Sequence, residues 1–233
     1  VGGVLLLRPP RLPEPNTLEA DVLQSFRSVN DLHAQSYALQ WRHKTKWIFR
    51  FRHSRQDFGD FRVPADSFLY NGFWLPIHEQ RLKNTAGQER NFSGTIGYTG
   101  DAGYSLVSFS QVHQQIGFFS GAHGIPTANS LSHDGDFRNL DFPYQDVMHR
   151  KVLWNSSLKI KESWLEADIG LQHNYRQEIS YPHTHGDFYP PDAGNLEHGF
   201  DLKTLSWNLR WRKSGAKWAP KLGASGQIQQ YRV

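Results

Sequence analysis

A regular alternation of side-chain character between Lys151 and Tyr175 constrains the fold of this chain more than any other feature. In the second half of the stretch one parity is mostly apolar, and its members are Leu165, Ala167, Ile169, Leu171, His173 and Tyr175. The first half follows the same rule, with Leu153 as the exception, and the halves are joined by Lys161-Glu162-Ser163. A period of two residues is typical of a β-strand with one apolar and one polar face. The stretch therefore predicts a long β-hairpin whose two faces differ in polarity.

The same period recurs along the chain and predicts about nine antiparallel strands. Their expected positions are 18–26, 36–42, 46–52, 92–98, 104–110, 151–160, 165–175, 204–211 and 218–231. Short connections alternate with long ones at 54–88, 111–148 and 176–199. Ordinary connections have a median of about 4–6 residues, whereas outer-membrane barrels combine short periplasmic turns with long extracellular loops. We therefore expect an all-β fold, an antiparallel up-and-down transmembrane β-barrel that is partial in this chain.

The composition agrees with a β-sheet that has one polar, water-exposed face. Hydrophobic residues make up 38% of the chain and aromatic residues 14%, with eight Trp, and the mean hydropathy is −0.63. A barrel in lipid can have this polarity because one of its faces lines an aqueous lumen. The sequence has no apolar run near the roughly 18 residues of a spanning helix, which excludes a helical membrane protein. A soluble β-sandwich remains the alternative, although aromatic residues near the strand ends favour the barrel.

Several function classes have no support in the sequence. The chain has no cysteine, which excludes a disulfide framework and a thiolate metal site. The net charge of +4 is spread along the chain, so nucleic acid is not an expected partner. Neither a Gly-x-Ser-x-Gly motif, a His-Glu-x-x-His motif nor a phosphate-binding loop is present. We therefore expect no catalytic residues and no enzyme activity.

The beginning of the sequence differs from the rest. The segment Gly2-Gly3-Val4-Leu5-Leu6-Leu7 reads as a short buried strand, and a proline-rich run follows it up to Pro15. Proline lacks the backbone N–H that a sheet ladder needs, so this run reads as a linker. The expected division is a short first unit at 1–15 and a strand-rich unit at 16–233.

Three segments resemble TonB-dependent outer-membrane receptors of the iron-complex or metal type. Gly2 to Leu7 resembles the end of their plug domain, and Phe119 to Pro126 resembles a Gly/Pro segment of an outer loop. Asp136 to Asp146, which leads into Val152, resembles the re-entry into the next barrel strand. Such receptors are plugged barrels of 22 strands. The resemblance therefore implies a fragment, with the end of the plug at 1–15 and the N-terminal portion of the barrel at 16–233.

The resemblance also implies a function and a location. Such a receptor lies in the outer membrane of a Gram-negative bacterium and takes up a scarce nutrient such as a ferric siderophore, haem or a metal ion. The implied partners are outer-membrane lipid, the transported ligand and a TonB-type energy-coupling complex that binds a segment absent here. No cofactor is required. The alternatives are a passive outer-membrane barrel and a soluble β-sandwich binding protein.

Histidines, arginines and one aspartate are the candidate ligand-binding residues. The residues concerned are His183, His185, Asp187, His198, His123, Arg50 and Arg52. Among them His183, His185 and His198 are the candidate metal ligands, because neutral imidazoles beside a carboxylate suit Zn²⁺, Cu²⁺ or Ni²⁺. The alternative for the histidines is an exposed polar loop without a ligand.

Charged residues on the polar parity form a second group, in which Arg50 and Arg52 are candidates for contact with an anionic chelate. The residues expected to line the lumen are Arg42, Arg50, Arg52, Lys151, Lys159, Glu166, Asp168 and Arg210. The alternative for each of them is a solvated wall with internal ion pairs.

Overall fold

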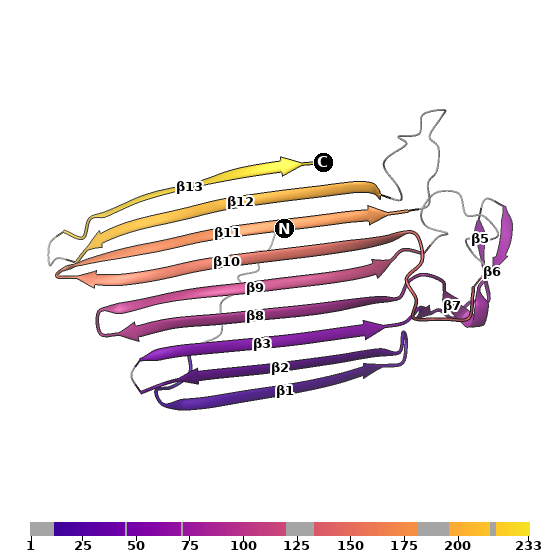
Figure 1. Ribbon diagram of the computed structural model, residues 1–233, viewed down its shortest axis with the longest axis horizontal. Helices are drawn as coiled ribbons and strands as arrows, with labels where there is room; N and C mark the ends of the chain where they lie inside the picture. Colours follow the sequence, from indigo (N-terminus) through magenta and orange to yellow (C-terminus); the bar gives the residue numbers. More distant parts are fainter. Residues whose placement is uncertain (1–11, 45, 71, 120–132, 181–195, 215–217) are drawn as a thin grey trace.

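The fold is built on one large nine-stranded antiparallel sheet, accompanied by two small two-stranded sheets (Figure 1). The computed structural model describes residues 12–44, 46–70, 72–119, 133–180, 196–214 and 218–233. The strands of the large sheet are β1 (Thr17–Arg27), β2 (Leu32–Arg42), β3 (Trp47–Phe58), β8 (Gly87–Gly100), β9 (Gly103–Gly117), β10 (Tyr144–Ile160), β11 (Ser163–Ile179), β12 (Leu196–Lys213) and β13 (Lys221–Arg232). They are ordered as they occur in the chain, and every neighbouring pair is antiparallel. The predicted all-β, up-and-down arrangement of nine strands is confirmed. The sheet is open, because β1 and β13 are its two edges.

Several strands are longer than the alternation predicts. β10 and β11 each contain 17 residues and β12 contains 18. Near the loops both faces carry polar side chains, as in Gln114-Gln115 and Arg176-Gln177-Glu178, so the two-residue period disappears although the ladder continues. The long connections are correspondingly shorter than expected, at 59–86, 118–143 and 180–195.

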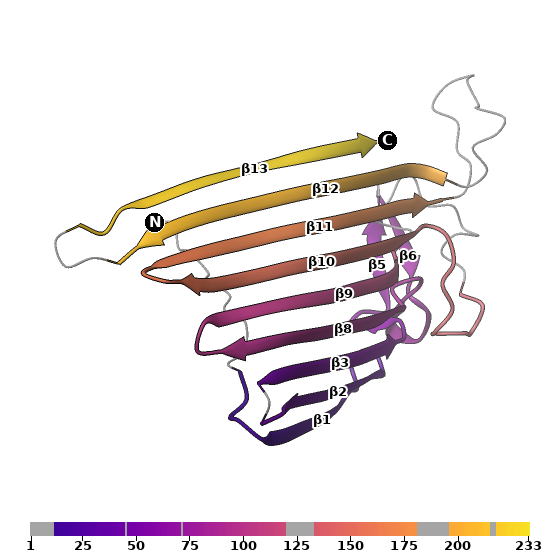
Figure 2. The same ribbon diagram turned by 60° about the vertical axis from the view of Figure 1, so that its left-hand side comes forward.

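The first long connection has secondary structure of its own. Two small hairpin-like sheets form within it, β4 (Phe61–Arg62) with β7 (Arg81–Leu82) and β5 (Ser67–Tyr70) with β6 (Phe73–Pro76). A single 3₁₀ turn, η1 (His78–Gln80), completes the connection. These elements gather at one end of the large sheet (Figure 2). No helix in the described part of the chain is long and apolar enough to cross a membrane.

The opposite end of the sheet consists of short turns that are joined to one another by backbone hydrogen bonds. Thr99 N–H donates to Lys46 O over 2.9 Å, and Lys159 N–H donates to Ala102 O over 2.7 Å. Ser214 N–H donates to Glu162 O over 3.0 Å. Neighbouring turns are therefore fixed relative to one another, and we call this the tight-turn end, in contrast to the loop end.

One face of the sheet is apolar across all nine strands. Residues that are partners in successive strand pairs form a row, and the central row is Leu18, Trp41, Phe49, Ile96, Val107, Trp154, Ile169, Trp207 and Gly226. The next row toward the loop end is Ala20, Leu39, Phe51, Gly94, Phe109, Val152, Leu171, Leu205 and Ile228. We call these rows and their neighbours the apolar band.

The apolar band is not covered by any described part of the chain. Leu18 is 66% exposed, Trp154 40% and Leu209 43%. Four described hydrophobic residues are buried, namely Leu32, Ile48, Ala86 and Ala167. The described apolar side chains therefore lie mainly on an open face rather than in an internal core.

The other face is polar. All eight charged residues that were expected to line a lumen share its parity, from Arg42 on β2 to Arg210 on β12. Arg210 lies 3.2 Å from Glu166 and 3.1 Å from Asp168, and Arg212 lies 3.2 Å from Glu166. Part of this face is thus a wall with internal ion pairs, as the alternative interpretation held.

Candidate functional site

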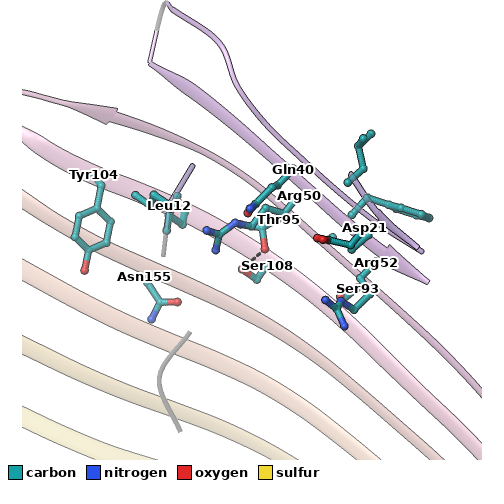
Figure 3. Close-up of a pocket in the computed structure, with 15 residues that line it drawn as sticks. Leu12, Asp21, Gln40, Arg50, Arg52, Ser93, Thr95, Tyr104, Ser108 and Asn155 are labelled. Atoms are coloured by element: carbon teal, nitrogen blue, oxygen red, sulfur yellow. Dashed lines mark hydrogen bonds between the residues drawn. The ribbon is translucent and has the colours of Figure 1, made fainter. Parts of the chain in front are cut away.

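A hollow of about 640 Å³ lies along the polar face over β1, β2, β3, β8, β9 and β10 (Figure 3). Arg50 and Arg52 line it from β3, and Tyr104 and Asn155 line it from β9 and β10. Leu12, from the segment before β1, lies beside these side chains. Two arginines and several hydroxyl and amide groups therefore face one open space.

The sequence places both arginines on this face because residues two apart in a strand share a side. Glu19 and Asp21 occupy the same rows on β1, two strands away, which corresponds to about 10 Å at the usual strand spacing. Among the described residues, no carboxylate lies within ion-pairing distance of Arg52. Because the Arg52 guanidinium has no carboxylate partner among the described residues, it can form bidentate hydrogen bonds with a carboxylate or phosphate group of a ligand.

Arg42 attaches the segment before β1 to the polar face. Its guanidinium donates to Pro13 O over 3.2 Å and to Thr99 Oγ1 over 3.2 Å. Leu12 and Pro13 belong to the unit expected at 1–15, and the preceding residues 1–11 lie outside the described part of the chain. The contact shows that the start of the described chain lies against the polar face.

At the loop end, Asp60 connects two of the long loops through a fully buried carboxylate. Its Oδ1 accepts hydrogen bonds from Thr85 N–H at 2.7 Å and Ala86 N–H at 3.0 Å. Its Oδ2 lies 3.0 Å from His133 Nε2, and both side chains are 1% exposed. Gly135 N–H donates to His133 Nδ1 over 2.9 Å, so the neutral ring carries its proton on Nε2 and donates it to Asp60.

Arg81 extends this cluster to the β1–β2 turn. Its guanidinium donates to Asp60 O over 3.0 Å and to Asp31 Oδ2 over 2.5 Å, and it lies 4.5 Å from the centre of the Phe137 ring. Arg138 donates to Asp31 O over 2.6 Å. The hydrogen bond from Arg81, together with the charges of Arg81, Arg62 and Arg138, holds the pKa of Asp31 below its ordinary value.

Asn84 connects the first and second long loops at a separate point. Its Nδ2 donates to Phe118 O over 3.0 Å and to Pro143 O over 2.7 Å, while its Oδ1 accepts from Asp141 N–H over 2.9 Å. The residue is 1% exposed. We call the set of contacts around Asp60, Arg81 and Asn84 the loop-end core, which joins the described parts of the first two long loops to each other and to the β1–β2 turn.

The β5–β6 hairpin presents large apolar side chains to solvent at this end. Leu69 is 58% exposed, Phe73 71% and Trp74 70%. Phe68 of the same hairpin packs against the second long loop, where the Phe68 and Phe119 rings are 5.2 Å apart. Exposed apolar groups of this size on a loop are typical of a contact surface.

The structure locates part of the predicted ligand set. His123, His183, His185 and Asp187 lie outside the described residues. His198 lies in β12 rather than in a loop, opposite Glu178, with its ring 6.4 Å from the Phe200 ring. Within the described ranges, no group of three His, Cys, Asp or Glu side chains is placed to hold a metal ion.

The sequence interpretation missed the loop-end core. Asp60 and His133 are 73 residues apart, and both lie in segments without a regular period. The β5–β6 hairpin had a usable signal, because Asn71-Gly72 between apolar residues is typical of a hairpin turn.

Comparison with known protein families and with curated proteins identifies no relative of this chain.

Proposed function

We propose that this chain forms part of the wall of an outer-membrane β-barrel and that the barrel is a TonB-dependent receptor. The observation that carries the first step is the apolar band, which continues through all nine strands and has no cover among the described residues. From Ile160 to Val152 it extends for about 26 Å along the strand at ~3.3 Å per residue, which corresponds to roughly 20 Å along the membrane normal at the usual strand tilt of about 40°. Barrels in outer membranes have an apolar band about 25 Å tall.

A soluble β-sandwich fits this arrangement less well. Its apolar face would have to pack on a second sheet at a distance of about 10 Å. In the described part of the chain, the two other sheets have two strands each and lie beyond the end of the large sheet. Lipid is therefore the cover that we propose for the band, and the open edges at β1 and β13 would be paired in the closed barrel.

The proposal that the barrel is a receptor rests on the difference between the two ends of the sheet, one with tight turns and one with long loops, and on the sequence resemblance. The tight-turn end would face the periplasm, and the loop end would face the outside and capture the ligand. The loop-end core joins the described parts of the first two long loops, and the arginines of the hollow would line the inner wall. The ligand would be a ferric siderophore, haem or a metal ion, and a TonB-type complex would supply the energy.

The histidine-rich segment is the proposed point of ligand contact. We assign this contact to His183, His185 and Asp187, with His198 and His123 as further contributors. If the ligand is a bare metal ion, His183, His185 and His198 would bind it as neutral imidazoles. Binding of a metal should then weaken as the pH falls through the ordinary His pKa of about 6.5.

The test is a fractionation and uptake experiment on cells that make the intact protein. We expect the protein in the outer membrane, and uptake of zinc, haem or a ferric siderophore that is lost when the TonB-type complex is inactivated. A His183→Ala/His185→Ala variant with normal surface display should take up less of the same ligand. Outer-membrane location with uptake independent of the energy-coupling complex would indicate a passive barrel. Recovery of the protein in the soluble fraction would contradict the whole proposal.

A further inference from the structure

A groove of about 520 Å³ lies at the tight-turn end, between the β10–β11 turn and the end of β12. Its apolar part consists of Ile160, Leu165 and Trp211, and its polar part includes Lys161, Glu162 and Lys213. Ile160 is 56% exposed and Leu165 46%. The groove thus combines an open apolar floor with a charged rim.

The strand register places this groove on the apolar face. Leu165 pairs with Trp211, in the row that contains Leu158 and Leu222. Ile160 lies in the following row, whose last member is Lys213. The floor is therefore the last part of the apolar band before the turns, where a membrane would end and water begin.

The rim has more positive than negative charge. Glu162 lies 3.6 Å from Lys213 and is 75% exposed, while Lys161 has no described carboxylate within ion-pairing distance. The rim thus carries two ammonium groups and one carboxylate. The backbone fixes this arrangement, since Ser214 N–H donates to Glu162 O over 3.0 Å and Lys213 N–H donates to Pro220 O over 3.1 Å.

We propose that the groove binds an anionic phospholipid of the leaflet on the tight-turn side. An acyl chain would lie along Ile160, Leu165 and Trp211, and the lipid phosphate would lie between Lys161 and Lys213. Lysine suits this position because its stem packs on apolar surface while its ammonium group stays in the polar region. Tryptophan is similarly favoured where one side of a ring is apolar and the other wet.

The apolar floor argues for a lipid over a free anion. A free phosphate would have contact with two exposed lysines and nothing else, whereas a lipid also covers the exposed ends of the apolar band. This inference rests on the membrane location given under the proposed function, so its test needs a separate readout for membrane insertion.

The experiment is native mass spectrometry of the intact protein with phosphatidylglycerol and with phosphatidylcholine of the same chains. We expect tighter retention of phosphatidylglycerol and a loss of about fivefold in affinity for each lysine removed in Lys161→Gln/Lys213→Gln. Lys161→Arg/Lys213→Arg should keep the preference because it keeps both charges. The matched control is Lys159→Gln/Lys221→Gln, which removes two charges from the same end but from the polar face. It should leave retention unchanged.

Insertion into phosphatidylcholine vesicles is the separate readout, because it needs no contact with the lysines. It distinguishes failure of the proposed membrane location from failure of the proposed lipid site. A protein that does not insert contradicts the proposed function and, with it, the lipid site. A protein that inserts, but retains both lipids equally or loses retention equally in the two glutamine variants, overturns the lipid site alone. Displacement of phosphatidylglycerol by millimolar inorganic phosphate would also overturn it, because the site would then be one for free anions.

Discussion

Asp60 and His133 form a hydrogen-bonded pair at 3.0 Å in which both side chains are 1% exposed. They belong to different long loops, so this contact holds the first connection against the second. The Asp60 carboxylate accepts hydrogen bonds on both oxygens, which is what a buried carboxylate requires. The loop end therefore depends on this contact, because His133 is the donor that the buried Oδ2 of Asp60 has among the described residues.

His133→Ala should loosen the loop end without affecting the large sheet. Removal of the imidazole leaves Asp60 Oδ2 buried without its donor, at a cost of about 1–3 kcal/mol. Hydrogen exchange should become faster at the amides of Thr85 and Ala86 and remain slow in β10 and β11. His78→Ala is the control, because its ring stacks on His133 with centroids 5.2 Å apart while its side chain is 49% exposed. Equal exchange in both variants would contradict the role of the buried pair.

Asp60→Asn should be damaging as well, although the change is nearly isosteric. The amide oxygen can still accept from Thr85 and Ala86, but the amide NH₂ group then faces the N–H of His133. A change of tautomer does not help, because the Nδ1 proton would meet Gly135 N–H. We expect a loss of about 1–3 kcal/mol, measured by the same exchange experiment. Exchange rates like those of the wild type would show that the loop end tolerates the mismatch.

The contribution of Asp31 should depend on pH in one direction. Its pKa in the folded protein is lowered, mainly by the hydrogen bond from Arg81. The stabilisation is therefore complete above the ordinary Asp pKa of about 3.9 and is lost as the pH falls through the lower, folded value. Asp31→Asn should lower stability by about 1–2 kcal/mol at pH 7, because Arg81 loses a charged partner.

The thermal unfolding midpoint of Asp31→Asn and of the wild type measures this effect. The difference between the two proteins should be constant from pH 8 to about pH 5 and should narrow below about pH 4. Asp136→Asn is a comparison on an exposed loop carboxylate that has no ion pair among the described contacts. A difference that persists unchanged at low pH would contradict the ion-pair explanation.

Leu209 and Asn208 allow a direct test of the two faces. They are adjacent in β12, and Leu209 lies in the apolar band whereas Asn208 pairs with Asp168 on the polar face. Leu209→Arg should cost about 2–4 kcal/mol if the band is in lipid at mid-membrane depth. Asn208→Arg should be tolerated, because it places a guanidinium beside a carboxylate. The measurement is folding into vesicles, and equal damage from both substitutions would contradict the assignment of the faces.

The sequence predicts the sheet better than the loops because strand register follows a local rule. Trp154 and Ile169 are cross-strand partners, and their parity alone places both on one face. The same reasoning places Arg50 and Arg52 on the other. It fails where polarity no longer alternates, which is why β10 was expected to begin at Lys151 instead of Tyr144 and β11 to end at Tyr175 instead of Ile179.

The loop-end core could not be predicted by that rule. Arg81 and Asn84 each make their contacts with residues 21 to 59 positions away. These contacts depend on the path of two loops whose sequences carry no period. Burial of a polar residue such as Asn84 can be recognised only after its partners are placed.

The final prediction concerns which end of the sheet faces the outside. Single cysteines at Glu79 and Asp136 mark the loop end, and single cysteines at Asp101 and Glu162 mark the tight-turn end. The chain has no native cysteine, so each variant carries a single label site. The side chains of Glu79, Asp101 and Glu162 are 65%, 100% and 75% exposed. Each is therefore accessible to a labelling reagent unless a membrane lies between the reagent and the residue. A reagent that does not cross membranes should label Glu79→Cys and Asp136→Cys on intact cells. It should label Asp101→Cys and Glu162→Cys only after the outer membrane is opened. Labelling of both ends on intact cells would show that no membrane separates them, and labelling of the tight-turn end alone would invert the proposed orientation.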